Sequence, residues 1–88
     1  MTKPPFRGIL YRAKKGGYRA KIYHQGRSIW LGCSRSPVDA AFLYDAAART
    51  LHKQDAVLNF PDEQPPLPIK AKVARKLVQL GLLKMPPS

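Results

Sequence analysis

Three short segments near the start of the chain alternate between apolar and polar residues. They are residues 6–12 (FRGILYR), 18–24 (YRAKIYH) and 27–31 (RSIWL), and alternation with a period of two is typical of strands with one buried face. Residues 14–17 and 25–26, which separate the segments, contain glycines of the kind that tight hairpin turns favour. This arrangement predicts a three-stranded antiparallel meander.

The same alternation assigns side chains to the two faces of the predicted sheet. Ile22 points to one face, and its neighbours Lys21 and Tyr23 point to the other. Likewise, Ile29 and Trp30 point to opposite faces. If the strands pair side by side, Trp30 shares a face with Lys21 and Tyr23, and the isoleucines form an apolar face that has to be covered.

The next segment predicts a helix that covers this apolar face. Ser36 and Pro37 mark its first turn, because serine caps helix N-termini and proline fits the first helical position, and Asp39 stands where its side chain can reach back to the cap. From here to Leu51 the chain is rich in alanine, so that the helix can lie close to the sheet. The residues expected on its packed side are Ala40, Ala41, Tyr44, Ala47, Ala48 and Leu51. The apolar residues 56–60 (AVLNF) are expected under the sheet or at its edge.

A second helix is predicted near the C-terminus. Residues 69–80 carry an apolar stripe at helical spacing, and Gly81 is a plausible C-terminal stop. The stripe consists of Ile69, Val73, Leu77 and Leu80. The fold class is therefore α+β: a three-stranded antiparallel sheet packed on one α-helix at residues 6–61, a proline-rich linker at 62–68, and a C-terminal amphipathic helix at 69–84.

The apolar stripe of the second helix needs a partner. Isolated helices of this length are marginally stable in water, so we expect the helix to dock on the small domain with its lysines outward. Three roles stay open at this point: packing on this domain or on a further part of a longer protein, extra contact with phosphates, and binding to a membrane surface.

The charge of the chain is segregated along the sequence. The 88 residues include 16 Lys or Arg and 5 Asp or Glu, for a net charge of +11. The cations that precede the first carboxylate, Asp39, are Lys3, Arg7, Arg12, Lys14, Lys15, Arg19, Lys21, Arg27 and Arg35. A surface that only keeps a protein in solution normally mixes both signs. A cationic sheet that carries a tryptophan instead suits a polyanion such as a nucleic acid.

Other classes of function find little support in the sequence. A domain of this length has hardly any room for an enclosed substrate pocket, and no spacing of Ser, His and Asp indicates a catalytic set. Cys33 is the sole cysteine, and His24 and His52 lack the spacing of metal ligands, so we expect no metal and no cofactor. No apolar run approaches the ~20 residues of a membrane span, and the N-terminus lacks the apolar stretch of a signal peptide. We expect an intracellular protein without enzymatic activity.

Several motifs in this order resemble one known family. The strings FRG (6–8), IWLG (29–32), YDAAA (44–48) and AVLNFP (56–61) are similar to the Apetala/ethylene-response-factor DNA-binding domain, over about residues 6–61. The resemblance implies a three-stranded sheet packed on one helix, and it implies that the sheet, rather than the helix, enters the major groove of DNA.

The resemblance also implies roles for individual residues. Arg7 and Arg12 stand where the family has arginines that contact bases and phosphates, Trp30 where it has a DNA-contacting tryptophan, and Tyr44 where it has a tyrosine that can reach a phosphate. Departures from the family's pattern include Leu10, which replaces a base-reading arginine of many members. Further departures are Lys21 in place of a glutamate, Tyr23 in place of an arginine, and Arg27 one place early, so that Ser28 takes the DNA-facing position. These changes bear on the target sequence, whereas the high cation count favours groove binding.

The sequence therefore predicts a nuclear transcription regulator that binds double-stranded DNA sequence-specifically through a basic sheet in the major groove. The expected groove-facing residues are Arg7, Arg12, Arg19, Lys21, Tyr23 and Trp30. The expected phosphate contacts are Lys14, Lys15, Arg27 and Tyr44. The alternative is a non-specific or structure-selective nucleic-acid module, such as an RNA-binding protein or the DNA-tethering arm of a nuclease. A protein partner bound through the C-terminal helix is a third class, and neither a membrane nor a small-molecule ligand is expected.

Overall fold

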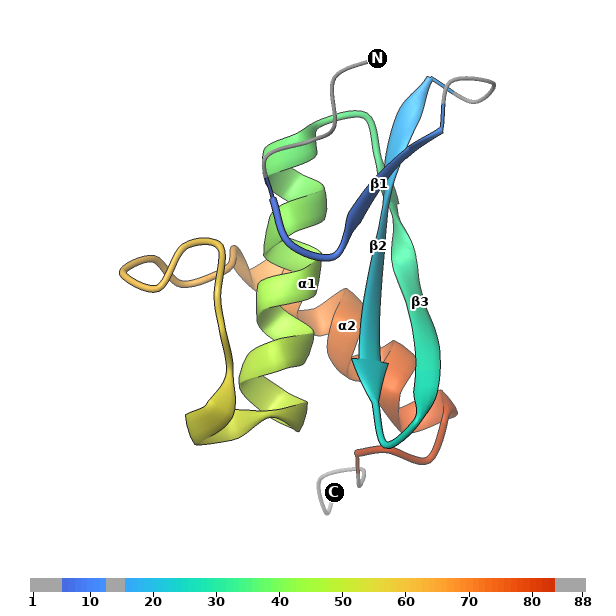
Figure 1. Cartoon of the computed structure of the whole chain (residues 1–88), viewed down its shortest axis with the longest axis vertical. Helices are drawn as coiled ribbons and strands as arrows, with labels where there is room; N and C mark the ends of the chain where they lie inside the picture. The colour runs from blue at the N-terminus through green and yellow to red at the C-terminus, as the bar shows by residue number, and fades with distance from the viewer. Residues whose placement is uncertain (1–5, 13–15, 84–88) are drawn as a thin grey trace.

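A three-stranded antiparallel sheet forms one layer of the molecule, and a helix covers one of its faces (Figure 1). The strands are β1 (Ile9–Arg12), β2 (Gly17–His24) and β3 (Arg27–Ser34), in the spatial order β1-β2-β3. They are followed by α1 (Pro37–Leu51), the short 3-10 helix η2 (Lys53–Asp55) and α2 (Leu67–Gln79). The computed structural model describes residues 6–12 and 16–83. It confirms the predicted α+β fold.

All three strands differ in length from the sequence-based expectation, β2 only by one residue, since it begins at Gly17. β1 begins only at Ile9, because the chain turns at Gly8, where φ is +78°. A Cβ atom at Gly8 would collide with the ring of Tyr44, so this turn combines a left-handed backbone with a close approach that glycine permits. β3 continues to Ser34, beyond the predicted end at Leu31. The strands are joined as a meander, as predicted.

An irregularity in the register lies in the middle of β2 and β3. Trp30 pairs with Lys21, but Gly32 pairs with Ala20, so β3 contains one residue more than β2 at this point. The extra residue, Leu31, is buried in the core. Such a β-bulge increases the local twist of the strand pair. The bulge shifts the alternation of β3 by one residue, so that Cys33 pairs with Arg19 and is exposed instead of pointing into the core.

The predicted N-terminus of α1 is confirmed. Ser36 is the N-cap, Pro37 is the first helical residue, and the Ser36 Oγ accepts a hydrogen bond from the Asp39 N–H at 3.3 Å. The Asp39 carboxylate was expected to accept a hydrogen bond from the backbone N–H of the cap. Instead, the Ser36 N–H donates to the Ser34 Oγ at 3.2 Å. The end of β3 and the start of α1 are thereby tied together.

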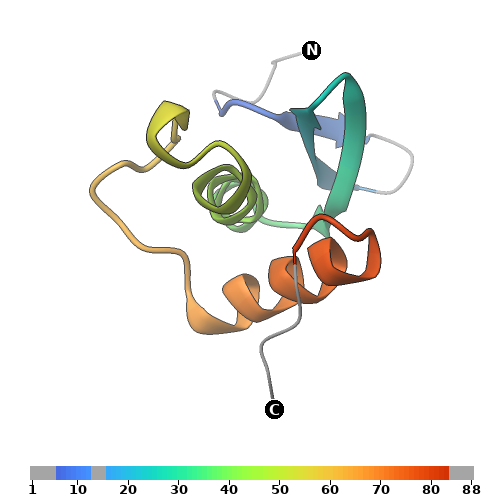
Figure 2. The same ribbon diagram turned by 90° about the horizontal axis from the view of Figure 1, so that it is seen from below.

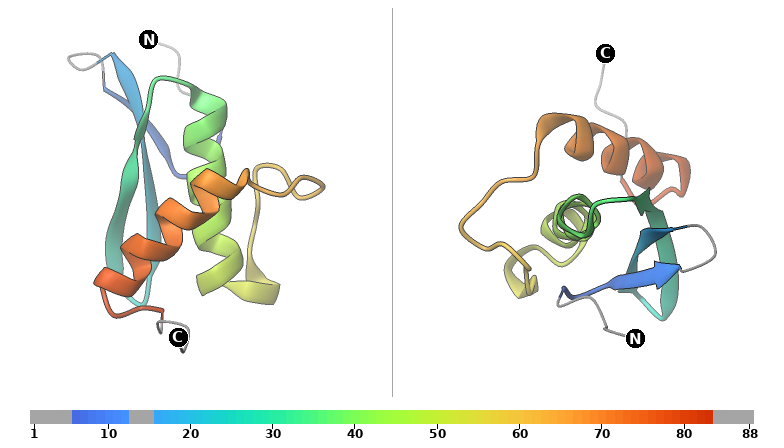
Figure 3. Two further views of the ribbon diagram at one scale, coloured as in Figure 1. Left: turned by 180° about the vertical axis from the view of Figure 1, so that it is seen from behind. Right: turned by 90° about the horizontal axis from the view of Figure 1, so that it is seen from above.

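Helix α1 is buried on more sides than its sequence pattern indicates. Every residue from Ala40 to Ala48 is buried, although only one side was expected to pack. The views along the axis of α1 show why (Figure 2 and Figure 3, right). The helix lies in the centre, with the sheet on one side, α2 on another, and the segment that joins α1 to α2 on a third. The many alanines suit a helix that has neighbours this close on several sides.

The segment after η2 is fixed to α1 by a buried carboxylate. Asp45, which is fully buried, accepts hydrogen bonds from the backbone N–H groups of Asn59 and Phe60, each at 2.8 Å. The Phe60 ring packs on Phe42 of α1 and on Phe6, with ring centroids 4.6 and 5.2 Å apart. This apolar segment therefore packs along α1 and the residues before β1, rather than beneath the sheet.

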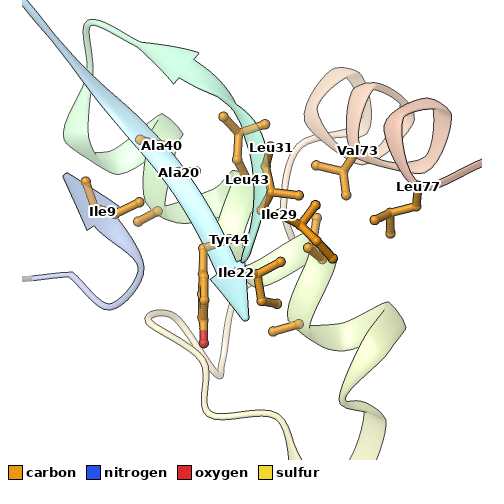
Figure 4. Packing of buried hydrophobic residues seen from close by; sticks show 14 residues of the cluster. Ile9, Ala20, Ile22, Ile29, Leu31, Ala40, Leu43, Tyr44, Val73 and Leu77 are labelled. Carbon is orange, nitrogen blue, oxygen red and sulfur yellow. The ribbon is translucent and has the colours of Figure 1, made fainter. Parts of the chain in front are cut away.

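Helix α2 docks on the rest of the domain, as the apolar stripe predicts. Val73 and Leu77 are fully buried next to Leu31, Ile29 and Leu43 (Figure 4). The stripe is narrower than expected, since Ile69 is half-buried and Leu80 is exposed. The helix begins two residues earlier than predicted, at Leu67, and ends before Leu80. The predicted C-terminal stop at Gly81 is confirmed: this glycine follows the C-cap Leu80, and the Gly81 and Leu82 N–H groups donate to the carbonyls of Val78 and Leu77 at 3.0 and 2.9 Å, a Schellman motif.

Candidate nucleic-acid interface

The face of the sheet that points away from α1 is rich in cations and aromatic side chains. This outer face consists of Leu10, Arg19, Lys21, Tyr23, Ser28, Trp30 and Cys33. The opposite, inner face carries Ile9, Ala20, Ile22, Ile29 and Leu31, all of which are buried against the helices (Figure 4). The predicted division between the two faces is confirmed.

Trp30 is the centre of the outer face. Its ring lies under two cations of β2, with the Arg19 Cζ 4.0 Å and the Lys21 Nζ 5.5 Å from the ring centroid. Lys21 is the direct cross-strand neighbour of Trp30, whereas Arg19 lies across from Cys33 because of the bulge. Cation–π attraction holds both side chains beside the ring. The arrangement holds two positive charges against the aromatic ring at the centre of the face.

Both ends of the outer face carry further exposed side chains. Tyr23 pairs with Ser28 near the β2–β3 turn and is 63% exposed. Leu10 pairs with Arg19 and is 44% exposed, so an apolar patch adjoins the cations.

The Tyr23 carbonyl accepts a hydrogen bond from the His52 Nε2 at 3.0 Å, which fixes the end of β2 to the end of α1.

Two of the predicted site residues lie away from this face. Tyr44 belongs to α1 and is 8% exposed, packed beneath the turn at Gly8. Burial raises the pKa of the Tyr44 phenol, and the nearby Arg7 guanidinium partly opposes this shift. Arg7 is exposed in the turn before β1, where Asn59 fixes its backbone: the Arg7 N–H donates to the Asn59 Oδ1 at 2.6 Å, and the Asn59 Nδ2 donates to the Arg7 carbonyl at 3.1 Å. Arg7 and Tyr44 therefore form a separate pair at the β1 side of the sheet.

The remaining predicted residues lie at the ends of the strands. Arg27 is exposed at the start of β3, opposite His24. Arg12 ends β1 and pairs through its backbone with Gly17. Lys14 and Lys15, predicted as phosphate contacts, fall outside the described residues. The structure thus brings together Arg19, Lys21, Tyr23 and Trp30 from the predicted set.

The sequence alone did not indicate that any residue of α2 lies beside Trp30. In the structure, Lys72, Arg75 and Lys76 line a shallow groove whose other wall is formed by Trp30 and its neighbours in β3. The amphipathic pattern correctly indicated that these cations face away from the core, but it could not indicate which strand they would meet.

The described residues also bear on metal binding and on membrane insertion. Within residues 6–12 and 16–83, no group of three or more His, Cys, Asp and Glu side chains could hold a metal ion. In this described part of the chain, no helix is both long enough and apolar enough to cross a membrane.

The chain is similar to several plant transcription factors. Ethylene-responsive transcription factor ERF026 of Arabidopsis thaliana is 36% identical over 73 residues, which are 81% of this chain and 29% of that protein. Ethylene-responsive transcription factor ERF025 of the same plant is 45% identical over 56 residues, 64% of this chain and 24% of that protein. The AP2/ERF and B3 domain-containing transcription factor RAV1, also of Arabidopsis thaliana, is 38% identical over 57 residues, 65% of this chain and 16% of that protein.

Each match covers a large share of this chain but a small share of the relative. Most of this chain is matched, but it spans less than a third of the length of each of these three relatives, between 16% and 29%. The similarity is therefore that of one shared domain. No family model matches the chain.

Proposed function

This chain carries a domain of the AP2/ERF type, and on that premise we propose that it is a transcription regulator that binds double-stranded DNA with the outer face of its sheet. In this proposal the sheet lies in the major groove and reads base sequence, and the protein acts in the nucleus. The proposal assigns no catalytic step to the chain.

The observation that carries the proposal is the group of Arg19, Trp30 and Lys21. The major groove of B-DNA is about 12 Å wide and admits a β-ribbon, and arginine can form two hydrogen bonds to guanine there. Because Arg19 lies 4.0 Å above the Trp30 ring, its guanidinium is held before binding and loses less conformational entropy on contact. The apolar ring of Trp30 can contact thymine methyl groups beside it.

The cations at the strand ends have a different role in this proposal. Contacts with phosphates fix the position of a protein on the duplex but carry no base information. Arg27 at the β2–β3 turn would contact the backbone on one side of the groove. Lys14 and Lys15, which fall outside the described residues, stay expected phosphate contacts from the sequence. Arg7 extends the cationic surface at the β1 side.

Selection from random duplex DNA is the direct test of this function. We expect one enriched motif, and we expect unlabelled duplex of that motif to displace a labelled copy far better than single-stranded DNA or RNA. Absence of any motif, combined with equal displacement by all three nucleic acids, would instead support a non-specific nucleic-acid module.

A pair of variants separates base reading from backbone contact. Arg19→Gln is expected to cost about 1–3 kcal/mol of binding free energy on the selected site and to relax preference at one or two base pairs. Arg27→Gln, at the edge of the surface, is expected to weaken all duplexes by a similar factor. If both variants select the same motif as the unaltered protein, Arg19 is not a base reader.

A further inference from the structure

The basic side of helix α2 continues the cationic surface beyond the edge of the sheet. Lys72, Arg75 and Lys76 line a groove together with Trp30 and Gly32 of β3. We propose that this side of α2 binds the phosphates of the DNA strand that runs beside β3. The inference rests on the proposed DNA binding by the sheet, and it adds a second element to that interface, outside the segment that carried the resemblance.

The orientation of α2 follows from its buried residues. Val73 and Leu77 are one helical turn apart and both are fully buried, which fixes the rotation of the helix about its axis. Positions three and four residues apart share a side of a helix, and Lys72, Arg75 and Lys76 have this spacing. These three residues line one groove with Trp30 and Gly32 of β3, so their side of the helix lies next to that strand. Figure 3 (left) shows α2 crossing beside β3.

Contact between α2 and β3 is close at Gly32. A Cβ atom on Gly32 would lie 3.3 Å from the Lys72 Nζ, so the lysine side chain extends over the backbone of β3. Lys76 reaches the same strand further along, since it also lines a groove with Arg27, Ser28 and Trp30. Cations of β2 and of α2 therefore approach Trp30 from two directions.

Within residues 6–12 and 16–83, the strands and the helix that carry these cations contain no acidic side chain. The five acidic residues are Asp39, Asp45, Asp55, Asp62 and Glu63, none of them in β2, β3 or α2. The carboxylate of Asp45 is buried and already accepts hydrogen bonds from two backbone N–H groups. A row of like charges without counter-charges is stabilised by an anion that presents charge at regular intervals, as a nucleic-acid backbone does.

A membrane surface is a poorer match for this helix. An interfacial helix inserts its apolar side between lipids, but the apolar side of α2 is already buried in the protein core through Val73 and Leu77. The exposed apolar residues, Leu67 and Leu80, lie at opposite ends of the helix rather than on one continuous face. Charge complementarity therefore favours DNA as the occupant.

The double variant K72Q/R75Q tests the inference, with K70Q as the matched control. All three residues are exposed on the same helix, but Lys70 lines a different groove, with Arg49 and Gln64, away from β3. The affinity of each variant for the selected duplex is measured by fluorescence anisotropy at a series of salt concentrations. Each lost phosphate contact reduces the log–log salt slope by about 0.9 and weakens binding about fivefold at 0.15 M salt, if affinity at 1 M is unchanged.

We expect K72Q/R75Q to reduce the slope by about 2 and to leave the selected motif unchanged, whereas K70Q behaves like the unaltered protein. A slope and affinity equal to those of K70Q overturn the inference. So does loss of binding to anionic lipid vesicles in K72Q/R75Q with duplex affinity intact. Lys21→Gln distinguishes failure of this inference from failure of the proposed function. If Lys21→Gln weakens duplex binding and K72Q/R75Q does not, the sheet binds DNA and only the role of α2 is wrong. If the unaltered protein binds no duplex, the proposed function itself is wrong.

A measurement on the unaltered protein avoids dependence on the folding of a variant. In an NMR titration with the selected duplex, we expect the Arg75 side-chain Nε–H signal and the backbone amides of residues 71–79 to shift together with those of Arg19 and Trp30. Shifts confined to the sheet would contradict the inference even if the double variant proved unfolded.

Discussion

Replacement of Trp30 by alanine separates the function of the outer face from the stability of the fold. Trp30 is 37% exposed and lies on the face of the sheet that points away from α1, so its removal leaves the core between sheet and α1 intact. If the outer face binds DNA, Trp30→Ala is expected to impair binding strongly while the protein stays folded. Ile29→Ala, one residue earlier and on the inner face, is the matched control, because Ile29 is buried.

The magnitudes follow from the contacts of each side chain. Loss of the two cation–π contacts, with Arg19 and Lys21, costs about 1–2 kcal/mol of unfolding free energy, since exposed contacts of this kind contribute about 0.5–1 kcal/mol each. Ile29→Ala should cost about 2–5 kcal/mol, because it opens a cavity in the core. A tryptophan at the centre of an interface typically contributes 2 kcal/mol or more to binding, which is about 30-fold in Kd.

The assay combines thermal unfolding with duplex binding for the same preparations. Trp30 is the chain's single tryptophan, so its fluorescence also reports directly on DNA contact in the unaltered protein. We expect a smaller fall in Tm and about a 30-fold loss of affinity for Trp30→Ala, against a larger fall in Tm and near-normal affinity of the folded fraction for Ile29→Ala. The reasoning is refuted if Trp30→Ala lowers Tm as much as Ile29→Ala and binds duplex DNA normally.

Further predictions concern charge, the buried carboxylate, a titration and the docked helix. The affinity of the unaltered protein for any duplex should fall with salt with a log–log slope of roughly −5 to −6, and a slope shallower than about −2 would contradict the role of the cations. Asp45→Ala should lower the free energy of unfolding by several kcal/mol in denaturant titrations, because it leaves two backbone N–H groups without acceptors at a cost of about 1–3 kcal/mol each; an unchanged midpoint would contradict this. Since burial raises the pKa of Tyr44, this group stabilises the fold fully below pH about 10 and loses that contribution as pH rises further; phenolate absorbance should show one tyrosine titrating late, absent in Tyr44→Phe. Leu77→Ala should cost about 2–5 kcal/mol and expose the amides of α2 to exchange, whereas a protected helix in this variant would show that other contacts hold it.

The elements with a strong local signal could be predicted from the sequence. Alternation in residues 18–24 identified β2 and its two faces, and Ser36-Pro37 identified the start of α1 to the residue. Both signals act over a few residues, so neighbouring chain segments change them little. The same alternation placed Lys21 and Trp30 on one face, which the register confirms.

Features that depend on contacts distant in sequence could not be predicted in this way. Asp45 falls within an alanine-rich helix and has no local sign that its carboxylate is buried beneath Asn59 and Phe60. Gly8 interrupts a pattern that otherwise reads as strand, because its backbone approaches Tyr44, 36 residues later in the chain. Only the path of α2 in the folded domain determines that Lys72 meets Gly32.

Stability and the proposed interface depend on the same side chains of α2. Complete burial of an aliphatic side chain such as Val73 or Leu77 contributes about 1.5–3 kcal/mol, and a whole domain is stable by only about 5–15 kcal/mol. A sheet and one helix of this length have a small core, so the contribution of α2 is a substantial part of the total. The two buried residues also fix the rotation that turns Lys72 and Arg75 toward β3. A change that loosens the packing of α2 is therefore expected to weaken DNA binding as well as the fold, even where it removes no charge.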